Sequence, residues 1–315
     1  MDLRQMRYFL AIAEAGSITR AAEHLGVAQP ALSLHVKTME EALETQLLIR
    51  SKSGVTPTEA GRLLMQRART ILDDLARTED DIRTLDADPM GEVRIGLPGT
   101  ISNIIALPLI AAARDRYPRI RLNITEAMSG FIADWLEDGQ VDLAVLYEPS
   151  RPPGIASHQL LEEELVVLWS AQTEAPEIIS LADMLDVPLI LPSGPHGLRA
   201  LVEQAFVTLG NRPKVVMEID SYANIKRLVA AGYGGSILPL HSVLPETLDG
   251  TLVISRIAAP GLKRGAWLAH PAGRPATRAK EAVLELTVEV VKALLESGTW
   301  AGAQRSTRPV KRPRS

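Results

Sequence analysis

The sequence predicts an α/β protein with an N-terminal all-α winged helix-turn-helix unit, a long linker helix and a two-subdomain α/β domain. Three observations support this division. Residues 16–40 read as two short helices around a glycine turn, and a helix of roughly thirty residues after Thr58 keeps one narrow apolar stripe. From Glu92 onward, strand-like apolar runs alternate with helices, the pattern of a doubly wound sheet. Because this last region is long for one compact unit, we expect two subdomains there.

The segment 16–40 predicts two helices packed against each other. Ser17 has the side-chain oxygen of an N-cap, and Gly26 can end the first helix in a left-handed conformation. Pro30 fits the first turn of the second helix, where its missing N–H is not needed. Apolar residues at helical spacing mark the inward faces: Ala21, Ala22, Leu25, Leu32, Val36 and Met39. From this spacing alone, an ordinary helical hairpin is the alternative to a helix-turn-helix.

Elements on both sides complete the N-terminal unit. Residues 3–13 have the periodicity of a first helix that packs across the pair. Residues 47–57 predict a hairpin, or wing, on which Arg50 and Lys52 place positive charge, although solvated hairpin tips often carry lysine. The linker helix 59–88 has a stripe too narrow and too long for a small domain to cover, so we expect a partner helix and a dimer. Packing on the chain's own C-terminal domain is the alternative.

The remaining chain reads as alternating strands and helices. Apolar runs bounded by turn residues predict the strands, and the run at 141–146 suits a central parallel strand. The expected strands are 93–97, 120–124, 141–146, 165–169, 189–191, 215–219, 235–238 and 266–269, and the final helix is 275–296.

Net charge is unevenly distributed along the chain. The total is −4, but residues 1–69 carry nine Lys and Arg against seven Asp and Glu, and residues 301–315 carry five basic residues and no acid. Only these two segments favour phosphates electrostatically. The tail 301–315 lacks apolar periodicity, so we expect it to be disordered, and it either attracts phosphates or has no role.

Several classes of protein and site are disfavoured. The chain has no cysteine, which excludes disulfides and thiolate metal sites. It shows no secretory signal and no apolar stretch long enough for a bilayer, so we expect a cytoplasmic protein without a membrane partner. His196 near Ser193 lacks the strained elbow of a nucleophile, and the glycines of 231–236 run from helix into strand, the reverse of a dinucleotide motif. We therefore expect no enzyme activity, no cofactor and no metal site.

Residues 3–64 resemble the DNA-binding module of LysR-type transcriptional regulators. The matching pieces, in the family's order, are LRQMRYF (3–9), GSITRAA (16–22), QPALS (29–33), Glu40, LLIR (47–50) and GVTPTEAG (54–61). The rest of the chain to about residue 300 is similar to the family's effector domain, which is periplasmic-binding-protein-like, with a ligand between two subdomains. Within the family, segments 28–33, 47–50 and 54–61 look most like the nitrogen assimilation control branch.

The resemblance implies which residues contact DNA. Gln29, Pro30 and Ser33 match the family's groove contacts, and we expect the Gln29 amide to read an adenine edge. Leu34 stands where the family usually has Arg or Gln, so this position can read only an apolar surface such as a thymine methyl. Phosphate contacts, which set the register on DNA, are expected from Thr19, Lys37, Arg50 and Lys52.

The resemblance also places an effector site between the two subdomains. Gly99 and Thr100 follow the first strand, Ser129 lies where the family positions a ligand-binding hydroxyl, and Pro192 and Ser193 precede another helix. Hydroxyls and N–H groups at helix N-termini favour an anion such as a carboxylate, and ligands of such sheets bind outside the carboxyl ends of strands. Plain helix capping by the three hydroxyls is the alternative.

The expected domains follow from these elements. They are a winged helix-turn-helix at 1–58, a linker and dimerisation helix at 59–88, an effector domain at 91–300 and the tail at 301–315. Within the effector domain, subdomain I comprises 92–162 and 268–300, and subdomain II comprises 163–267.

The expected function is that of a sequence-specific transcriptional regulator modulated by a small anionic metabolite. As a homodimer or homotetramer it would read a pseudo-palindrome in double-stranded DNA, with RNA polymerase as a further candidate partner. One alternative is a regulator that uses no effector and acts by its abundance. A small-molecule-binding transport protein is the alternative from another class, and residues 1–90 contradict it.

Overall fold

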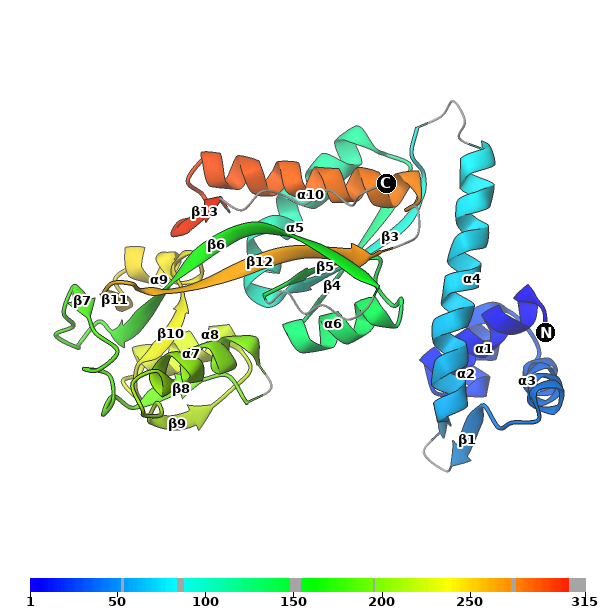
Figure 1. The fold of residues 1–315 in the computed structure, drawn as a ribbon, viewed down its shortest axis with the longest axis horizontal. Helices are drawn as coiled ribbons and strands as arrows, with labels where there is room; N and C mark the ends of the chain where they lie inside the picture. The colour runs from blue at the N-terminus through cyan, green and yellow to red at the C-terminus, as the bar shows by residue number, and fades with distance from the viewer. Residues whose placement is uncertain (52–53, 84–87, 148–153, 195, 273–275, 306–315) are drawn as a thin grey trace. The chain divides into compact units, whose positions relative to one another are not determined.

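A computed structural model describes residues 1–51, 54–83, 88–147, 154–194, 196–272 and 276–305 (Figure 1). Residues 1–88 form one compact unit, the N-terminal unit, and most of the remaining chain forms a second, the C-terminal unit. None of the helices in these ranges combines the length and the apolar character that a membrane span requires.

Three short helices build the N-terminal unit: α1 (Leu3–Ala15), α2 (Ile18–Leu25) and α3 (Gln29–Leu43). The Ser17 hydroxyl accepts a hydrogen bond from the backbone N–H of Arg20 at 3.4 Å, and Gly26 ends α2 with a φ of 65°, so both predicted ends of this helix are confirmed. The predicted inward face of α3 is confirmed as well, because Leu32, Val36 and Met39 are buried in the core of the unit.

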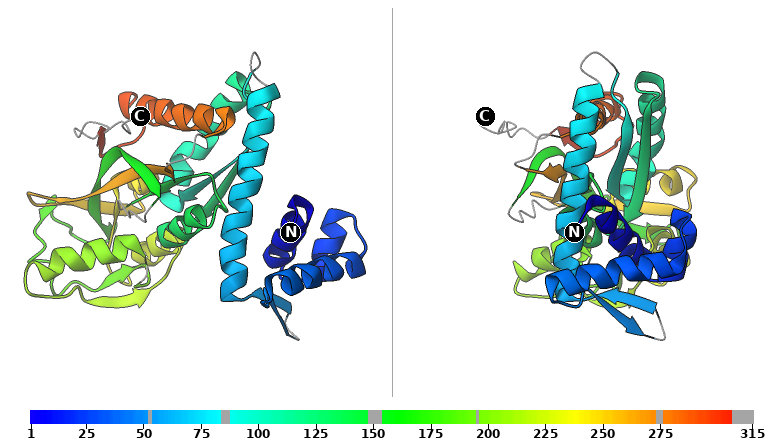
Figure 2. Two further views of the ribbon diagram at one scale, coloured as in Figure 1. Left: turned by 45° about the vertical axis from the view of Figure 1, so that its right-hand side comes forward. Right: turned by 90° about the vertical axis from the view of Figure 1, so that its right-hand side faces the viewer.

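The wing consists of β1 (Leu48–Ser51) and β2 (Gly54–Pro57), which pair antiparallel. Its position is set by the backbone N–H of Val55, which donates to the carbonyl of Gly16 in the α1–α2 turn at 2.9 Å. In the sequence, the linker helix α4 (Glu59–Arg83) begins two residues after the last residue of β2. A Cβ on Gly61 would lie 2.1 Å from the Leu47 carbonyl oxygen, so only glycine permits this close approach. Figures 1 and 2 show α1, α2 and α3 beside the N-terminal half of α4.

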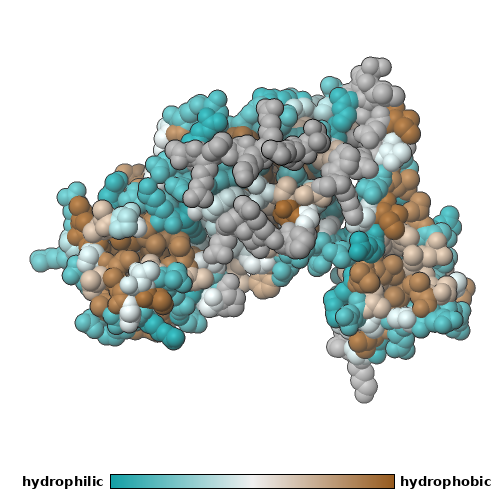
Figure 3. Space-filling view, in the orientation of Figure 1, coloured by the Kyte–Doolittle hydropathy of each residue, from teal (hydrophilic) through white to brown (hydrophobic). Residues whose placement is uncertain are grey.

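The apolar stripe of α4 is covered only in part within the N-terminal unit. Ala68 is buried against Met6 and Leu10 of α1. Farther along the helix, Ile71 is 40% exposed and Ile82 is 68% exposed. Figure 3 shows apolar side chains gathered on the surface of this unit. The helix was expected to reach residue 88. The observed helix ends at Arg83, and residues 84–87 lie outside the described residues.

The C-terminal unit has two lobes with separate cores. Lobe I contains three parallel strands in the order β4 (Ile120–Ala127), β3 (Gly91–Pro98) and β5 (Leu143–Leu146). Alternate residues of β5 enter different clusters: Leu143 and Val145 pack with α5 (Gly99–Arg116) and α10 (Arg278–Glu296), whereas Ala144 and Leu146 pack with α6 (Ser129–Glu137). The helices therefore cover both faces of the sheet, as predicted for an α/β domain.

Two long strands join the lobes. They are β6 (Ile155–Ser170) and β12 (Leu262–Pro271), which pair antiparallel along most of their length (Figure 1). Lobe II adds strands β7 (Ile178–Ile179), β10 (Ser236–Pro239) and β11 (Leu252–Ile257) to this sheet, and a separate parallel pair of β8 (Leu189–Leu191) and β9 (Val215–Glu218). Its helices are α7 (Gly197–Val207), α8 (Tyr222–Ala230) and α9 (Leu244–Leu248), with a 3₁₀ turn, η1 (Leu240–Ser242).

The prediction of a disordered tail from residue 301 is wrong for its first five residues. Ala303–Arg305 form strand β13, which pairs antiparallel with β6 at Leu161 to Glu163. Trp300, just before this strand, is 1% exposed and belongs to the core of lobe I. Burial of the indole explains why a segment without apolar periodicity is nevertheless ordered. Residues 306–315 lie outside the described residues.

Candidate functional site

A groove on the N-terminal unit brings together six of the eight residues predicted to contact DNA. It is lined by Gln29, Pro30, Ser33, Leu34 and Lys37 of α3, by Arg50 of the wing, and by Glu40, Gln46, Leu48 and Ile49. Thr19 is exposed on α2 and does not line the groove. Lys52 lies outside the described residues.

The first turns of α3 present polar atoms to this groove in a defined arrangement. The Gln29 side-chain amide donates to the Ser33 hydroxyl at 3.0 Å, which is possible because residues four apart lie on the same helix face. Leu34 is 64% exposed beside them. Lys37 is exposed and lies 3.5 Å from Glu41. The arrangement offers hydrogen-bonding groups, one apolar contact and positive charge on one surface.

Glu40 connects this helix to the wing, a role that the sequence did not reveal. Its Oε1 accepts hydrogen bonds from the backbone N–H groups of Leu47 (2.8 Å) and Leu48 (3.2 Å). A carboxylate that accepts two backbone N–H groups makes strong, directional contacts. Glu40 therefore holds β1 against α3, and Arg50 of β1 lines the same groove as Lys37 of α3.

A second candidate site lies where the two lobes of the C-terminal unit meet. Gly99 and Thr100 open α5, and Ser129 opens α6, all in lobe I. Pro192 and Ser193 follow β8 in lobe II. The lobes approach closely there, because a Cβ on Gly197 at the start of α7 would lie 3.3 Å from the Ser129 hydroxyl.

The helix-capping alternative is wrong for Thr100 and Ser193. The N-cap position of α5 is Pro98, which provides no side-chain cap, and the buried Thr100 hydroxyl instead contacts Arg264 and Tyr147. Ser193 bonds to Asp220 through both its N–H (2.8 Å) and its hydroxyl (3.0 Å). Among the described residues, Ser129 makes no side-chain hydrogen bond that would decide between the two roles, so its role stays a prediction. Pro192 is buried, and its carbonyl accepts a hydrogen bond from Arg199 Nη1 at 3.1 Å.

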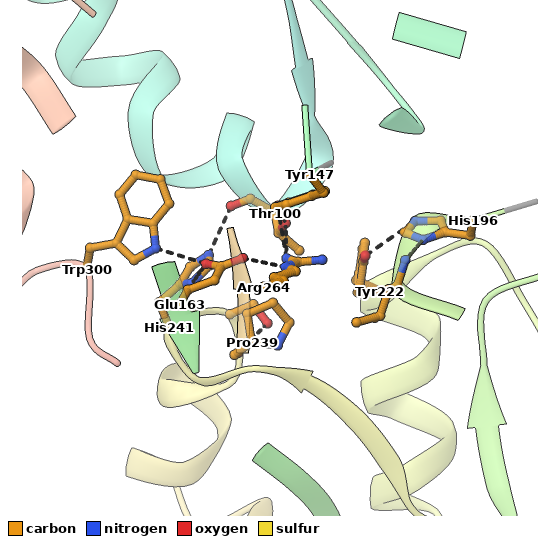
Figure 4. Close-up of polar contacts among 11 residues, drawn as sticks. Thr100, Tyr147, Glu163, His196, Tyr222, Pro239, His241, Arg264 and Trp300 are labelled. Atoms are coloured by element: carbon orange, nitrogen blue, oxygen red, sulfur yellow. Dashed lines mark hydrogen bonds and ion pairs between the residues drawn. The ribbon is translucent and has the colours of Figure 1, made fainter. Parts of the chain in front are cut away.

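A buried cluster centred on Arg264 of β12 and Glu163 of β6 includes Thr100, one of the predicted hydroxyl residues (Figure 4). Arg264 Nε donates to Glu163 Oε1 at 2.5 Å, and Arg264 Nη2 donates to the Thr100 and Tyr147 hydroxyls at 2.9 Å each. The guanidinium carbon also lies 3.6 Å from the centre of the Tyr147 ring, a cation–π contact.

The other oxygen of Glu163 is held by groups from the end of the chain and from lobe II. Trp300 Nε1 donates to Glu163 Oε2 at 3.1 Å, and His241 Nδ1 lies 3.1 Å from the same oxygen. His241 Nε2 is 3.1 Å from the Thr100 carbonyl oxygen. The cluster thus joins lobe I, the two long strands, lobe II and the C-terminal segment through one carboxylate.

The electrostatics of the cluster follow from its burial. Burial opposes ionisation of Glu163, but the Arg264 charge and the hydrogen bonds from His241 and Arg264 outweigh it and lower the pKa of Glu163 to about 2. Burial likewise opposes the charge on Arg264, and the carboxylate of Glu163 outweighs that effect and raises the Arg264 pKa. Both groups are therefore ionised at neutral pH.

His196 is a structural residue of the lobe II side. It is buried, its Nδ1 accepts a hydrogen bond from the Leu198 N–H at 3.1 Å as the N-cap of α7, and its Nε2 lies 3.3 Å from the Tyr222 hydroxyl. Burial and the nearby Arg264 charge lower the pKa of His196 to about 4, so the ring is neutral at pH 7. The hydroxyl of Ser193 bonds to Asp220, so the structure does not pair it with His196 as nucleophile and base.

Sequence reasoning missed the buried cluster, although a signal for it exists. Arg264 stands opposite Glu163 in the register of the two long strands, and both occupy the buried phase of an alternating pattern. Opposite charges in the inward phase of two apolar strands indicate a buried ion pair, provided that the strands are known to be neighbours. Tyr147, Tyr222 and His241 carry no such signal, because each lies singly at the end of a different element.

Comparisons with known proteins identify the family of the chain. The family model described as the LysR substrate binding domain matches residues 86–292, and the model of the bacterial regulatory helix-turn-helix protein, lysR family, matches residues 3–62. The nitrogen assimilation regulatory protein of Klebsiella aerogenes is 35% identical over 92% of this chain and 95% of its own length. Its counterpart in Escherichia coli is 35% identical over 95% of this chain and 99% of its own length.

Solved structures show the same architecture. Full-length OxyR from Pseudomonas aeruginosa is similar with a TM-score of 0.79 and 24% identity, covering 98% of this chain and 99% of OxyR. CbnR, crystallised with its target DNA, is similar with a TM-score of 0.54 and 25% identity, covering 92% of this chain and all of that one. With its DNA-binding and effector-binding domains in this order, the chain belongs to the LysR family of transcriptional regulators, a family that is not enzymatic.

Proposed function

We propose that the α3 groove enters the major groove of duplex DNA and that Gln29 reads a base edge there. The observation that carries this proposal is the gathering of Gln29, Ser33, Leu34 and Arg50 around one groove. In helix-turn-helix proteins, the N-terminal residues of the second helix contact the bases. The Gln29 amide can donate and accept at an adenine, and the exposed Leu34 suits a thymine methyl.

Phosphate contacts come from the edges of the groove in this proposal. Arg50 of the wing and Lys37 of α3 supply positive charge, and Thr19 at the start of α2 supplies a hydroxyl near that helix N-terminus. Lys52 is assigned to the same role from its place in the sequence. These contacts fix the register of the protein on the duplex without selecting sequence.

We propose further that the protein binds DNA as a homodimer or as a dimer of dimers. Ile71 and Ile82 of α4 are exposed apolar residues on a 25-residue helix, which a second copy of α4 would cover. Two recognition helices related by a two-fold axis would then read a pseudo-palindrome. As a regulator of chromosomal DNA it would act in the cytoplasm, with RNA polymerase as a further partner.

The effector of this proposal is a small anionic metabolite bound between the lobes. Gly99, Thr100 and Ser129 approach from lobe I, and Pro192 and Ser193 from lobe II. A ligand in this place shifts the arrangement of the dimers only by binding one arrangement more tightly than another. A regulator that works by abundance is the second candidate, which is favoured by the internal hydrogen bonds that already engage Thr100 and Ser193.

Footprinting of the DNA that flanks the gene tests the proposal. We expect protection of two half-sites about one helical turn apart, and loss of protection at high salt. A footprint that lengthens or shortens when a small organic acid is added supports the effector, whereas the same footprint with every acid supports regulation by abundance. Absence of any protected sequence at low salt would overturn the proposed DNA contacts.

A further inference from the structure

We propose that Arg264 is the cationic donor of a carboxylate-binding subsite, and that the Tyr222 hydroxyl and the Thr100–Tyr147 hydroxyl pair are its other donors. The inference rests on the proposed effector function and names the chemical group of the ligand. Figure 4 shows Arg264 between Thr100 and Tyr147 on one side and Tyr222 with His196 on the other. Of these four neighbours, only Thr100 belongs to the residues predicted from the sequence.

The first argument is an unused donor. Arg264 is 5% exposed, and its Nε and Nη2 are engaged by Glu163 and by the Thr100 and Tyr147 hydroxyls. Its buried Nη1 has no hydrogen-bond partner among the residues that the structure describes. A buried guanidinium N–H without an acceptor is costly, so the site is incomplete as it stands.

The second argument concerns Tyr222. Because His196 Nδ1 accepts from the Leu198 N–H, we assign the ring proton to Nε2, which then donates to the Tyr222 oxygen 3.3 Å away. Tyr222 therefore accepts from His196, and its own proton is available for another acceptor. Burial raises the pKa of Tyr222, and the Arg264 charge together with a direct side-chain interaction with Arg264 opposes that rise; burial and the same charge lower the pKa of His196. The guanidinium therefore lies close to both side chains.

The third argument is a count of protons at the hydroxyl pair. Thr100 and Tyr147 both accept from Arg264 Nη2, and they share one hydrogen bond with each other. One of the two hydroxyl protons makes that bond, which leaves one proton over. Arg264 Nη1, Tyr222 and this pair thus each keep a donor proton for a further acceptor.

Charge then selects an anion over a neutral acceptor. Thr100 is the second residue of α5, His196 caps α7 and Tyr222 opens α8, so the positive ends of three helix dipoles lie around Arg264. Glu163 is held by Arg264 Nε on one oxygen and by Trp300 Nε1 on the other, and it makes no hydrogen bond with Nη1. A carboxylate has two oxygens and about four acceptor positions, which matches the donors left over.

Nη1 is buried, so a ligand reaches it only if a neighbouring group moves, and Tyr222 faces Arg264 across the subsite (Figure 4). Tyr222 belongs to lobe II and Arg264 to a strand that joins the lobes. Binding of a carboxylate at this subsite is therefore coupled to the position of lobe II, which gives an anionic effector a route to the rest of the molecule.

Calorimetric titration of the full-length protein with acetate at constant ionic strength tests the subsite, with acetamide as the neutral control of similar shape. We expect saturable acetate binding that Tyr222→Phe weakens about tenfold or more, the loss of one hydrogen bond to a charged group. Tyr233→Phe, at a tyrosine that is 57% exposed, is the matched control and leaves the affinity unchanged. Equal binding of acetate and acetamide would overturn the assignment of a carboxylate.

A second variant keeps the test independent of folding defects. Replacing both members of the ion pair, Glu163→Gln with Arg264→Gln, removes the charge without leaving a lone buried ion, and we expect it to abolish acetate binding. If wild type, Tyr222→Phe and the double variant bind acetate equally, this subsite is overturned. That result would still be compatible with an effector site elsewhere between the lobes. No acetate binding by the wild type overturns the subsite, and a footprint insensitive to every organic acid overturns the proposed effector function itself.

Discussion

Glu163 Oε1 and Arg264 Nε lie 2.5 Å apart on directly opposed positions of β6 and β12, and the two residues are 1% and 5% exposed. Such a pair repays its desolvation only when the remaining polar atoms are also engaged. Trp300 and His241 face the second oxygen of Glu163, and Thr100 and Tyr147 accept from Nη2 of Arg264, which leaves Nη1 of Arg264 as the atom of the pair without a hydrogen bond among the described residues. The ion pair is therefore the point at which both lobes and the C-terminal segment are joined.

Removal of one member of this pair should destabilise the C-terminal unit strongly. We expect Glu163→Ala to lower its unfolding free energy by about 3–5 kcal/mol, because the Arg264 charge is then buried alone. Replacing both residues by glutamine should cost less than the sum of the two single glutamine replacements. Calorimetry of the full chain, following the transition of this unit, gives the coupling, and strictly additive losses would contradict it.

Stability of the C-terminal unit should fall as the pH is lowered from about 6.5 to about 4. The folded-state pKa of His196 is lowered from 6.5 to about 4, so between these values the unfolded chain binds a proton that the folded chain does not. Stability is therefore complete above the unfolded pKa and decreases by at most about 1.4 kcal/mol per pH unit below it.

The variant His196→Asn separates this effect from general acid denaturation. Asparagine can cap α7 but does not titrate, so the slope of stability against pH should become shallower in this range. Urea titrations at pH 7.0, 6.0 and 5.0 measure the slope. An unchanged slope in the variant would show that another group is responsible.

Glu40 should be required for DNA binding although it reads no base. We expect Glu40→Ala to lower affinity for all sequences, because the wing loses the carboxylate that accepts from the Leu47 and Leu48 N–H groups. Hydrogen exchange at these two amides should rise in the same variant. Full protection of both amides would contradict the positioning role.

Two variants should separate base reading from phosphate contact. Gln29→Ala should reduce discrimination at one position of each half-site by about 1–3 kcal/mol, whereas Arg50→Ala should weaken binding uniformly across sequences and reduce the slope of affinity against salt. Titration of both variants on matched and substituted duplexes measures these effects. An equal loss on every sequence for Gln29→Ala would exclude its reading role.

The exposed apolar residues of α4 should hold the dimer together. We expect Ile82→Glu, and more strongly the double variant with Ile71→Glu, to shift the protein to monomers at micromolar concentration, because a charge replaces an apolar contact in the helix interface. Leu248→Glu, at a residue 85% exposed in lobe II, is the control. Sedimentation equilibrium distinguishes the outcomes, and a dimer unaffected by both α4 substitutions would place the interface elsewhere.

Local sequence signals were sufficient to predict the N-terminal unit and the strand–helix order of the C-terminal unit. These signals act within a few residues: Ser17 caps a helix, Gly26 ends it, and Leu32, Val36 and Met39 recur at helical spacing. They can therefore be recognised in the sequence without knowledge of the tertiary structure. The groove residues of α3 were expected from the resemblance to the family, and the helical period explains why they share one face.

Only the tertiary structure determined the cluster around Arg264 and the order at residues 301–305. Glu163 and Arg264 are 101 residues apart and meet because β6 and β12 are neighbours in register, and Trp300 reaches Glu163 from the segment that follows α10. A buried charge is tolerated only where partners from distant segments surround it, and no local pattern records which segments will meet.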